Sequence, residues 1–197
     1  MERRRTVGRY RLIDLGMWLM MLLVFETVVL KAATRWFPAQ AYYVSVVPAI
    51  SAIVYMRWGA WGIVHAVLGG VVTGVNLRLG RTGVLIYTLG NALSVGALGL
   101  IRLMGSDAVR TDTVRTMLYG FAVFALMLAG KALAGLVFRM DASLGRMLLR
   151  FAPEIITLLF TEVVLWIARR QDGVFEPQRE YLKRIQKQQE QERGENP

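Results

Sequence analysis

The chain contains no cysteine and only one histidine, His65, among its 197 residues. Without cysteine it forms no disulfide and offers no thiol nucleophile or thiolate metal ligand, and one histidine does not build a histidine-rich metal site. The motifs H-E-x-x-H, G-x-S-x-G and G-x-x-x-x-G-K-[ST] are also missing, which leaves zinc, serine and nucleotide hydrolysis unsupported. We therefore expect a protein that is not an enzyme and binds no cofactor or metal, with His65 as a hydrogen-bonded packing residue.

Acidic residues are scarce, with 14 Asp and Glu against 24 Lys and Arg, and the formal net charge is +10. The chain is nevertheless 55% hydrophobic with a mean hydropathy of +0.42, because its basic residues gather between apolar runs. At such positions basic residues set membrane orientation and contact anionic lipid. We therefore expect an all-α, polytopic protein of the cell membrane, with membrane lipid and not nucleic acid as a partner.

Six apolar runs have roughly the 20 residues that a membrane-spanning helix needs. They are residues 12–30, 38–56, 60–77, 83–104, 114–138 and 151–168. The second and third are separated only by Arg57, Trp58 and Gly59, which we interpret as a tight turn between two crossings. Six crossings place both termini on one side, and the excess of Lys and Arg on that side predicts that it is cytoplasmic.

The chain thus divides into a six-helix transmembrane domain, residues 1–170, and a polar cytoplasmic tail, residues 171–197. Pro177 and Gly194 are suited to begin and end a helix in the tail, on which Tyr181, Leu182 and Ile185 form a small apolar stripe. A solvated, partly disordered tail is the simpler interpretation. Docking of the tail on a membrane surface or a partner is the alternative.

Four ionisable residues, Glu26, Lys131, Glu154 and Glu162, lie inside the apolar runs. A charge at the centre of a membrane helix costs about 2.5 to 3.5 kcal/mol on the mildest scale, so such residues usually face a protein interior, a cavity or each other. Their positions along the runs predict that the first three lie in the outer half of the membrane. Glu162 lies deeper, and the sequence assigns it no role.

Hydroxyl and amide side chains share helical faces with these charges. Thr157 and Thr161 follow Glu154 at i+3 and i+7, while Asn91 and Ser94 follow Tyr87 at i+4 and i+7. If these stripes and Lys131 face a common interior, they would bind a small polar solute. The candidate solute-binding residues are Glu26, Trp36, Tyr87, Asn91, Ser94, Lys131, Glu154, Thr157 and Thr161.

Two alternatives stay open for these residues. In the first, Lys131 merely pairs with Glu26 or Glu154, and the hydroxyl groups bond across helices. In the second, Trp36 belongs to an aromatic belt at the membrane interface and not to a lid over the cavity.

Small residues recur every four positions in the third run, at Gly62, Ala66, Gly70 and Gly74. Such a ridge permits close approach of another helix, either inside this protein or in a partner. Internal packing is the simpler interpretation, and docking of a partner is the alternative.

Three segments resemble the substrate-binding S component of energy-coupling factor transporters. They are VSVVPAI from residue 44, MRWGAWGIVHAVLGG from residue 56 and IYTLGNALS from residue 86. The resemblance implies a six-helix fold that holds a vitamin-like or other small organic solute in its outer half. It also implies docking onto a transmembrane coupling subunit served by cytoplasmic ATPases. Members commonly carry Ala-x-x-x-Ala on the first helix for docking, but residues 12–30 contain no alanine, so Gly16 or the ridge would have to replace it.

Two other functions are compatible with the sequence. A small membrane scaffold, similar in size to the membrane subunit of bacterial rod-shape morphogenesis, also has short loops and a polar tail. An intramembrane enzyme would rely on the carboxylates alone. The identity of the solute is open as well, because a lysine suits a carboxylate or phosphate whereas the surplus acids suit an amine.

Overall fold

The computed structural model describes residues 2–38, 43–138, 145 and 152–195, and every regular element in these ranges is a helix. The elements are α1 (Glu2–Trp36), α2 (Val47–Trp58), η1 (Gly59–Trp61), α3 (Gly62–Asn76), α4 (Gly80–Ala92), η2 (Leu93–Ala97), α5 (Leu98–Met104), α6 (Ser106–Thr111), α7 (Thr113–Val137), η3 (Ala152–Glu154), α9 (Ile155–Ala168) and α10 (Gln178–Glu195). The expectation of an all-α protein is confirmed for the described residues.

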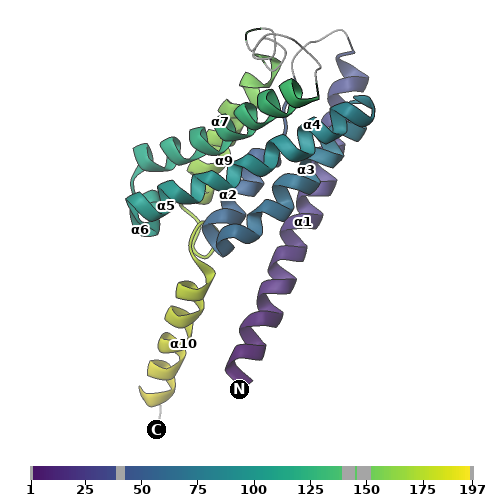
Figure 1. Cartoon of the computed structure of the whole chain (residues 1–197). Coiled ribbons are helices and arrows are strands. Elements are labelled where there is room, and N and C mark those ends of the chain that lie inside the picture. Colours follow the sequence, from purple (N-terminus) through teal and green to yellow (C-terminus); the bar gives the residue numbers. More distant parts are fainter. Residues whose placement is uncertain (1, 39–42, 139–144, 146–151, 196–197) are drawn as a thin grey trace.

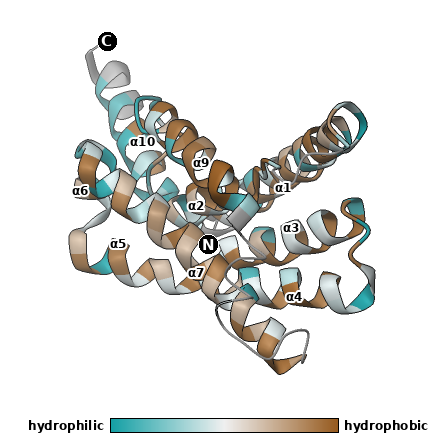
Figure 2. Ribbon diagram, turned by 90° about the horizontal axis from the view of Figure 1, so that it is seen from above, coloured by the Kyte–Doolittle hydropathy of each residue, from teal (hydrophilic) through white to brown (hydrophobic). Residues whose placement is uncertain are grey.

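Four helical stretches are long and apolar enough to cross a membrane. They are Val7–Trp36, Val47–Asn76, Gly80–Met104 and Thr113–Val137, and α9 is a shorter apolar helix. Large apolar side chains on α1 are exposed, with Leu12 at 73% and Met20 at 62%. Figure 2 shows that hydrophobic residues dominate α1 and α9. Apolar surface of this extent is what a membrane protein presents to lipid.

The stretch Val47–Asn76 folds back on itself at Gly59. The backbone of Gly59 has φ +61°, a conformation that suits glycine, and it ends α2. Beyond it, Gly62 lies against Tyr55, and Gly69 lies against Val47. Because the contacts run in opposite directions along the two helices, α2 and α3 are antiparallel, and the predicted tight turn is confirmed.

The helices run back and forth between two ends of the molecule (Figure 1). The start of α1 and the end of α10 lie at one of these ends, which we call the terminal end. The opposite, distal end holds the end of α1, the start of α2 and the turn between α3 and α4. Polar side chains are buried at both ends of the bundle.

The small-residue ridge of α3 is an internal packing surface. All four of its residues are buried. A Cβ atom on Gly70 would lie 2.5 Å from the carbonyl oxygen of Tyr87, so α3 and α4 approach at backbone distance. The ridge is therefore not available to a partner, which corrects the docking alternative for Gly62, Ala66, Gly70 and Gly74. By contrast, Gly16 is exposed on α1, with nothing within 4 Å of a Cβ built there.

A second close approach joins α4 to α7. A Cβ on Gly130 would lie 2.1 Å from the carbonyl oxygen of Gly90, and a Cβ on Gly90 would lie 2.5 Å from the backbone nitrogen of Lys131. Only glycine permits this distance at both positions. The contact places the part of α7 that includes Lys131 directly against α4.

The tail does not separate from the bundle where its composition changes. At the terminal end, Arg57 bonds to Asp14 through Nε (3.0 Å) and Nη2 (2.5 Å), and its Nη1 donates to the carbonyl oxygens of Gly173 and Val174. Phe175 is fully buried. Residues 173–178 of the tail are therefore packed and not solvated, although Gln171 and Asp172 before them are exposed. The packed part of the chain thus extends past residue 170.

Beyond this contact, α10 matches the helix predicted between Pro177 and Gly194. Gln178, its first residue, is fully buried and receives a hydrogen bond from Tyr10 (3.2 Å). Tyr181 and Leu182 are only partly buried, and the helix projects away from the bundle (Figure 1). The contacts of α10 with the preceding segment reach Arg184, whose Nη2 donates to Oε1 of the buried Glu176 (2.9 Å).

Candidate solute-binding site

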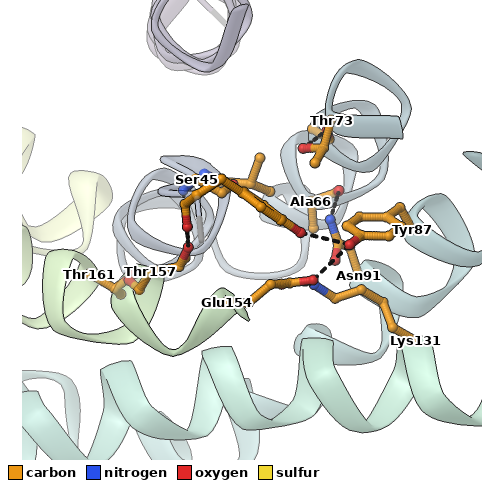
Figure 3. Close-up of polar contacts among 12 residues, drawn as sticks. Ser45, Ala66, Thr73, Tyr87, Asn91, Lys131, Glu154, Thr157 and Thr161 are labelled. Carbon is orange, nitrogen blue, oxygen red and sulfur yellow. Dashed lines mark hydrogen bonds and ion pairs between the residues drawn. The ribbon is translucent and has the colours of Figure 1, made fainter. Parts of the chain in front are cut away.

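A small cavity lies at the distal end, where five helices and the segment before α2 meet. Its volume is about 10 Å³, which is room for roughly one water molecule. The lining residues are Tyr43, Ser45, Val47, Pro48, Thr73, Tyr87, Asn91, Met127, Lys131 and Glu154. Figure 3 shows many of these side chains pointing toward one another.

Lys131 and Glu154 form an ion pair on one side of the cavity. Both residues are almost fully buried, with exposed fractions of 4% and 3%. The hydroxyl of Tyr87 donates to Oε1 of Glu154 (2.9 Å) while Oε2 binds Lys131, so both carboxylate oxygens are used. The ammonium of Lys131 also lies 4.7 Å from the centre of the Tyr87 ring, within the range of a cation–π contact.

Tyr43 extends this network from the segment before α2. Its hydroxyl lies 2.6 Å from the hydroxyl of Tyr87. Since Tyr87 donates to Glu154, the hydroxyl of Tyr43 is the donor in this contact. A chain of hydrogen bonds thus runs from Tyr43 through Tyr87 to the Lys131–Glu154 pair. Figure 3 shows Tyr87, Glu154 and Lys131 side by side.

Asn91 brings an unused acceptor to the cavity. Its Nδ2 donates to the carbonyl oxygen of Ala66 (3.2 Å), which fixes the amide on α3. Its Oδ1 is buried and has no hydrogen-bond partner among the described residues. Buried polar atoms without a partner are uncommon in folded proteins, so this oxygen marks the place where a water molecule or a polar group of a ligand fits.

Glu26 lies behind the cavity and does not line it. Its carboxylate is fully buried and accepts hydrogen bonds from Ser45 Oγ (2.9 Å), Val46 N (2.8 Å) and Thr73 Oγ1 (2.6 Å). These donors satisfy the buried charge without a cation in direct contact. Since two of them precede α2 and one is on α3, Glu26 holds the start of α2 and the end of α3 to α1.

The hydroxyl groups of the predicted stripes bond across or along helices. Thr157 Oγ1 accepts from the backbone nitrogen of Ser45 (3.0 Å), and Thr161 Oγ1 donates to the carbonyl oxygen of Thr157 (2.7 Å). Ser94 Oγ donates to the carbonyl oxygen of Asn91 (2.6 Å) and lies 2.9 Å from the hydroxyl of Tyr55. None of these three residues lines the cavity, and their hydroxyl groups are used in bonds within the protein, as in the structural alternative.

All but one of the predicted residues therefore fall into two groups. Tyr87, Asn91, Lys131 and Glu154 line the cavity together, whereas Glu26, Ser94, Thr157 and Thr161 support it from behind. Trp36 is in neither group, because it is 71% exposed at the end of α1. Its inclusion among the site residues is corrected, and the interpretation as an interfacial aromatic residue fits its exposure.

Sequence reasoning missed several lining residues, among them Tyr43, Ser45 and Thr73. Tyr43 was recognisable only as one of several aromatic residues near the first outer loop. Ser45 and Thr73 were recognisable as hydroxyl groups able to satisfy Glu26, but the sequence offers many hydroxyl groups and does not say which of them are within reach.

The two remaining polar residues of interest lie outside the cavity. His65 bonds through Nε2 to the carbonyl oxygen of Leu15 (3.1 Å), which agrees with its predicted packing role. Both carboxyl oxygens of Glu162 are buried without a hydrogen-bond partner among the described residues, and a Cβ on Gly120 of α7 would lie 2.8 Å from one of them. In the part of the chain that the structure describes, no three His, Asp or Glu side chains are grouped to hold a metal ion.

Comparisons of the chain with protein-family models, with curated protein sequences and with solved structures find no match.

Proposed function

We propose that this chain is a membrane subunit that captures a small polar solute at the distal cavity for uptake into the cell. In this proposal the chain crosses the cell membrane six times, with both termini in the cytoplasm and the cavity in the outer half. The antiparallel α2–α3 hairpin supports the count of six, because it divides one apolar stretch of 30 residues in two. The basic residues on the terminal side support the orientation.

The observation that carries the proposal is the set of polar groups around one cavity. A buried lysine, a buried glutamate and the unpartnered Oδ1 of Asn91 converge there from three separate helical elements. A single structural ion pair would not require the unused amide oxygen beside it. Together these groups offer a cation, an anion and a neutral acceptor, which is a suitable set for orienting a small solute.

A solute larger than water requires the cavity to widen, since its volume is about 10 Å³. The groups that would separate are Lys131 from Glu154, and Tyr43 from Tyr87. Parting the ion pair separates two buried opposite charges, which is costly unless the solute supplies a charged or polar group for each. The site therefore favours a solute that carries an acidic group for Lys131 and an N–H or ammonium group for Glu154.

Uptake would need energy from other chains, because the sequence has no nucleotide-binding loop. The resemblance to energy-coupling factor S components supplies the class of partner, namely a transmembrane coupling subunit with cytoplasmic ATPases. Of the positions considered for docking on that subunit, only Gly16 is exposed, on the apolar face of α1 that includes Leu12 and Met20. Docking in this proposal therefore rests on α1.

The first experiment is native mass spectrometry of the full chain purified in a mild detergent. We expect an added mass of one small molecule, which fragmentation identifies and which is then used in a binding titration. The double variant Lys131→Met with Glu154→Leu should fold but not bind it, because both charges are removed together and neither is left unpaired. Lys183→Met, an exposed lysine on α10, is the matched control and should bind normally.

A second candidate function is a membrane scaffold without a small-molecule ligand. It is favoured by the small volume of the cavity and by the hydrogen bonds that satisfy Glu26 and Glu154 inside the protein. Under this alternative every preparation shows the protein mass alone. A double variant that binds the identified solute as tightly as the wild type would refute the proposed site.

A further inference from the structure

A second, larger pocket opens at the distal end between the last turns of α1 and the end of α3. Its volume is about 480 Å³. It is lined by Lys31, Thr34, Arg35, Val75, Asn76, Leu77 and Arg78. Three of these residues are cations and none is an acid, so the lining has a strongly positive character unlike that of the solute cavity.

In the part of the chain that the structure describes, no acidic side chain pairs with these charges. In the described ranges, none of the ion pairs includes Lys31, Arg35 or Arg78. The two polar neighbours are bonded within their own helices. Thr34 Oγ1 donates to the carbonyl oxygen of Leu30 (3.0 Å), and Asn76 Nδ2 donates to that of Val72 (2.9 Å). Like charges that share one concave site attract an anion to it.

Arg78 occupies a backbone position that normally belongs to glycine. Its φ is 54°, and it is the only residue other than glycine with positive φ among the described residues. Hydrogen bonds from Leu79 N to Gly74 O (3.1 Å) and from Arg78 N to Val75 O (3.1 Å) close the turn that ends α3. This turn favours glycine at the position of Arg78, since an L side chain is strained there. Strain of this kind is often kept where the side chain has a function.

The surroundings of the pocket match the boundary between membrane and water. Trp36 and Phe37 follow Arg35 directly and are 71% and 54% exposed, and exposed aromatic residues gather at the level of lipid headgroups. Val75, in the wall of the pocket, is 60% exposed and apolar. A ligand with a phosphate group and an adjoining apolar part would fit such a site.

We propose that this pocket binds the phosphate of an anionic lipid headgroup at the distal surface. The guanidinium groups of Arg35 and Arg78 can each donate two parallel hydrogen bonds to phosphate oxygens, and Lys31 adds a third positive charge. The first methylene groups of the lipid lie along Val75 and Leu77. This site is separate from the solute cavity and does not depend on the proposed function.

The test uses the full chain, stripped of lipid in a neutral detergent and titrated with short-chain phosphatidylglycerol. Short-chain phosphatidylcholine and inorganic phosphate are titrated in parallel, with native mass spectrometry and the fluorescence of Trp36 and the other tryptophans as readouts. We expect one phosphatidylglycerol to bind per chain, more weakly at high salt. Phosphatidylcholine, which has no net charge, should bind at least about tenfold more weakly.

The decisive variant is Arg78→Gly. It removes a cation and also relieves the backbone strain, so it should melt at the same or a higher temperature while binding phosphatidylglycerol about tenfold more weakly or worse. Arg81→Gln is the matched control, because Arg81 is an exposed cation at the same end that does not line the pocket. Arg35→Gln is a second test of the same prediction.

Three results would overturn the proposal. The first is wild-type affinity in both Arg78→Gly and Arg35→Gln. The second is equal binding of phosphatidylcholine and phosphatidylglycerol. The third is complete displacement of the lipid by millimolar inorganic phosphate, which would assign the pocket to a free anion.

Discussion

The buried ion pair between Asp14 and Arg57 permits a quantitative test of how the tail is attached to the bundle. Both side chains are about 95% buried, and Asp14 Oδ2 also accepts a hydrogen bond from Trp58 Nε1 (2.6 Å). Replacing Asp14 by Leu leaves the guanidinium with the two tail carbonyl groups and the ring of Trp18, whose centre is 5.6 Å away. Replacing Arg57 by Met leaves the carboxylate with only the indole N–H. In each case a buried charge loses its partner, which costs about 3 to 5 kcal/mol.

The double variant, Asp14→Leu with Arg57→Met, leaves no buried charge. It loses mainly the hydrogen bonds from Arg57 to Gly173 and Val174, which we estimate at about 2 to 3 kcal/mol. We therefore expect the two single effects not to add, with a coupling free energy on the order of 3 kcal/mol or more. The free energy of unfolding is measured by denaturant titration in lipid bicelles, followed by tryptophan fluorescence.

The same variants report on the tail directly. Because Arg57 binds the backbone of Gly173 and Val174, Arg57→Met should make the chain near these residues accessible to limited proteolysis. The matched control is Arg102→Met, which removes an exposed cation on α5. Single variants that each lose less than about 1 kcal/mol, or losses that simply add, would refute the reasoning.

Three further predictions concern packing and the support of the site. Gly130→Ala should lower the free energy of unfolding by about 1 to 3 kcal/mol, because its Cβ would meet the carbonyl oxygen of Gly90. The control Gly99→Ala, with open space around its Cβ, should be neutral or stabilising. Equal melting temperatures for these two variants would contradict the prediction. Phe175→Ala should cost about 3 to 5 kcal/mol in the same denaturant titration, and a loss below about 1 kcal/mol would show that the tail is not docked. Glu26→Gln should cost about 1 to 3 kcal/mol, because an amide cannot accept all the bonds that the carboxylate receives. Hydrogen exchange should then be faster in the segment before α2, and unchanged exchange would argue against the role of Glu26 in holding it.

Several features of the fold were predictable because they depend on neighbouring residues. The turn at Gly59 was indicated by a run too long for one crossing, and the helix of the tail by its flanking proline and glycine. Helical spacing placed Tyr87 and Asn91 on one face of a helix, and the cost of a charge in an apolar run singled out Lys131 and Glu154. That these faces meet was a conditional prediction, and it depends on how the helices pack.

Other features depend on which helices are adjacent. The sequence showed Glu26 as a costly charge but did not identify Ser45 and Thr73 as its donors, since these come from two other elements. Asp14 and Arg57 looked like unrelated residues near the ends of apolar runs, and their pairing appears only when α1 and α2 lie side by side. Spacing along one helix carries no information on such contacts.

Composition and periodicity by themselves determined that this chain is helical and apolar enough for a membrane. They also showed four ionisable residues inside the apolar runs, where a charge is costly without a partner. Only the tertiary structure decided which partners Glu26, Lys131 and Glu154 have, and that the α3 ridge is internal. It also decided that the solute cavity is closed to about the size of one water molecule. The physical reason is that these features depend on the distance between helices that are far apart in the sequence. Local sequence specifies which face of a helix is polar, whereas the approach of α4 to α7 at Gly90 and Gly130 specifies how much space is left between those faces.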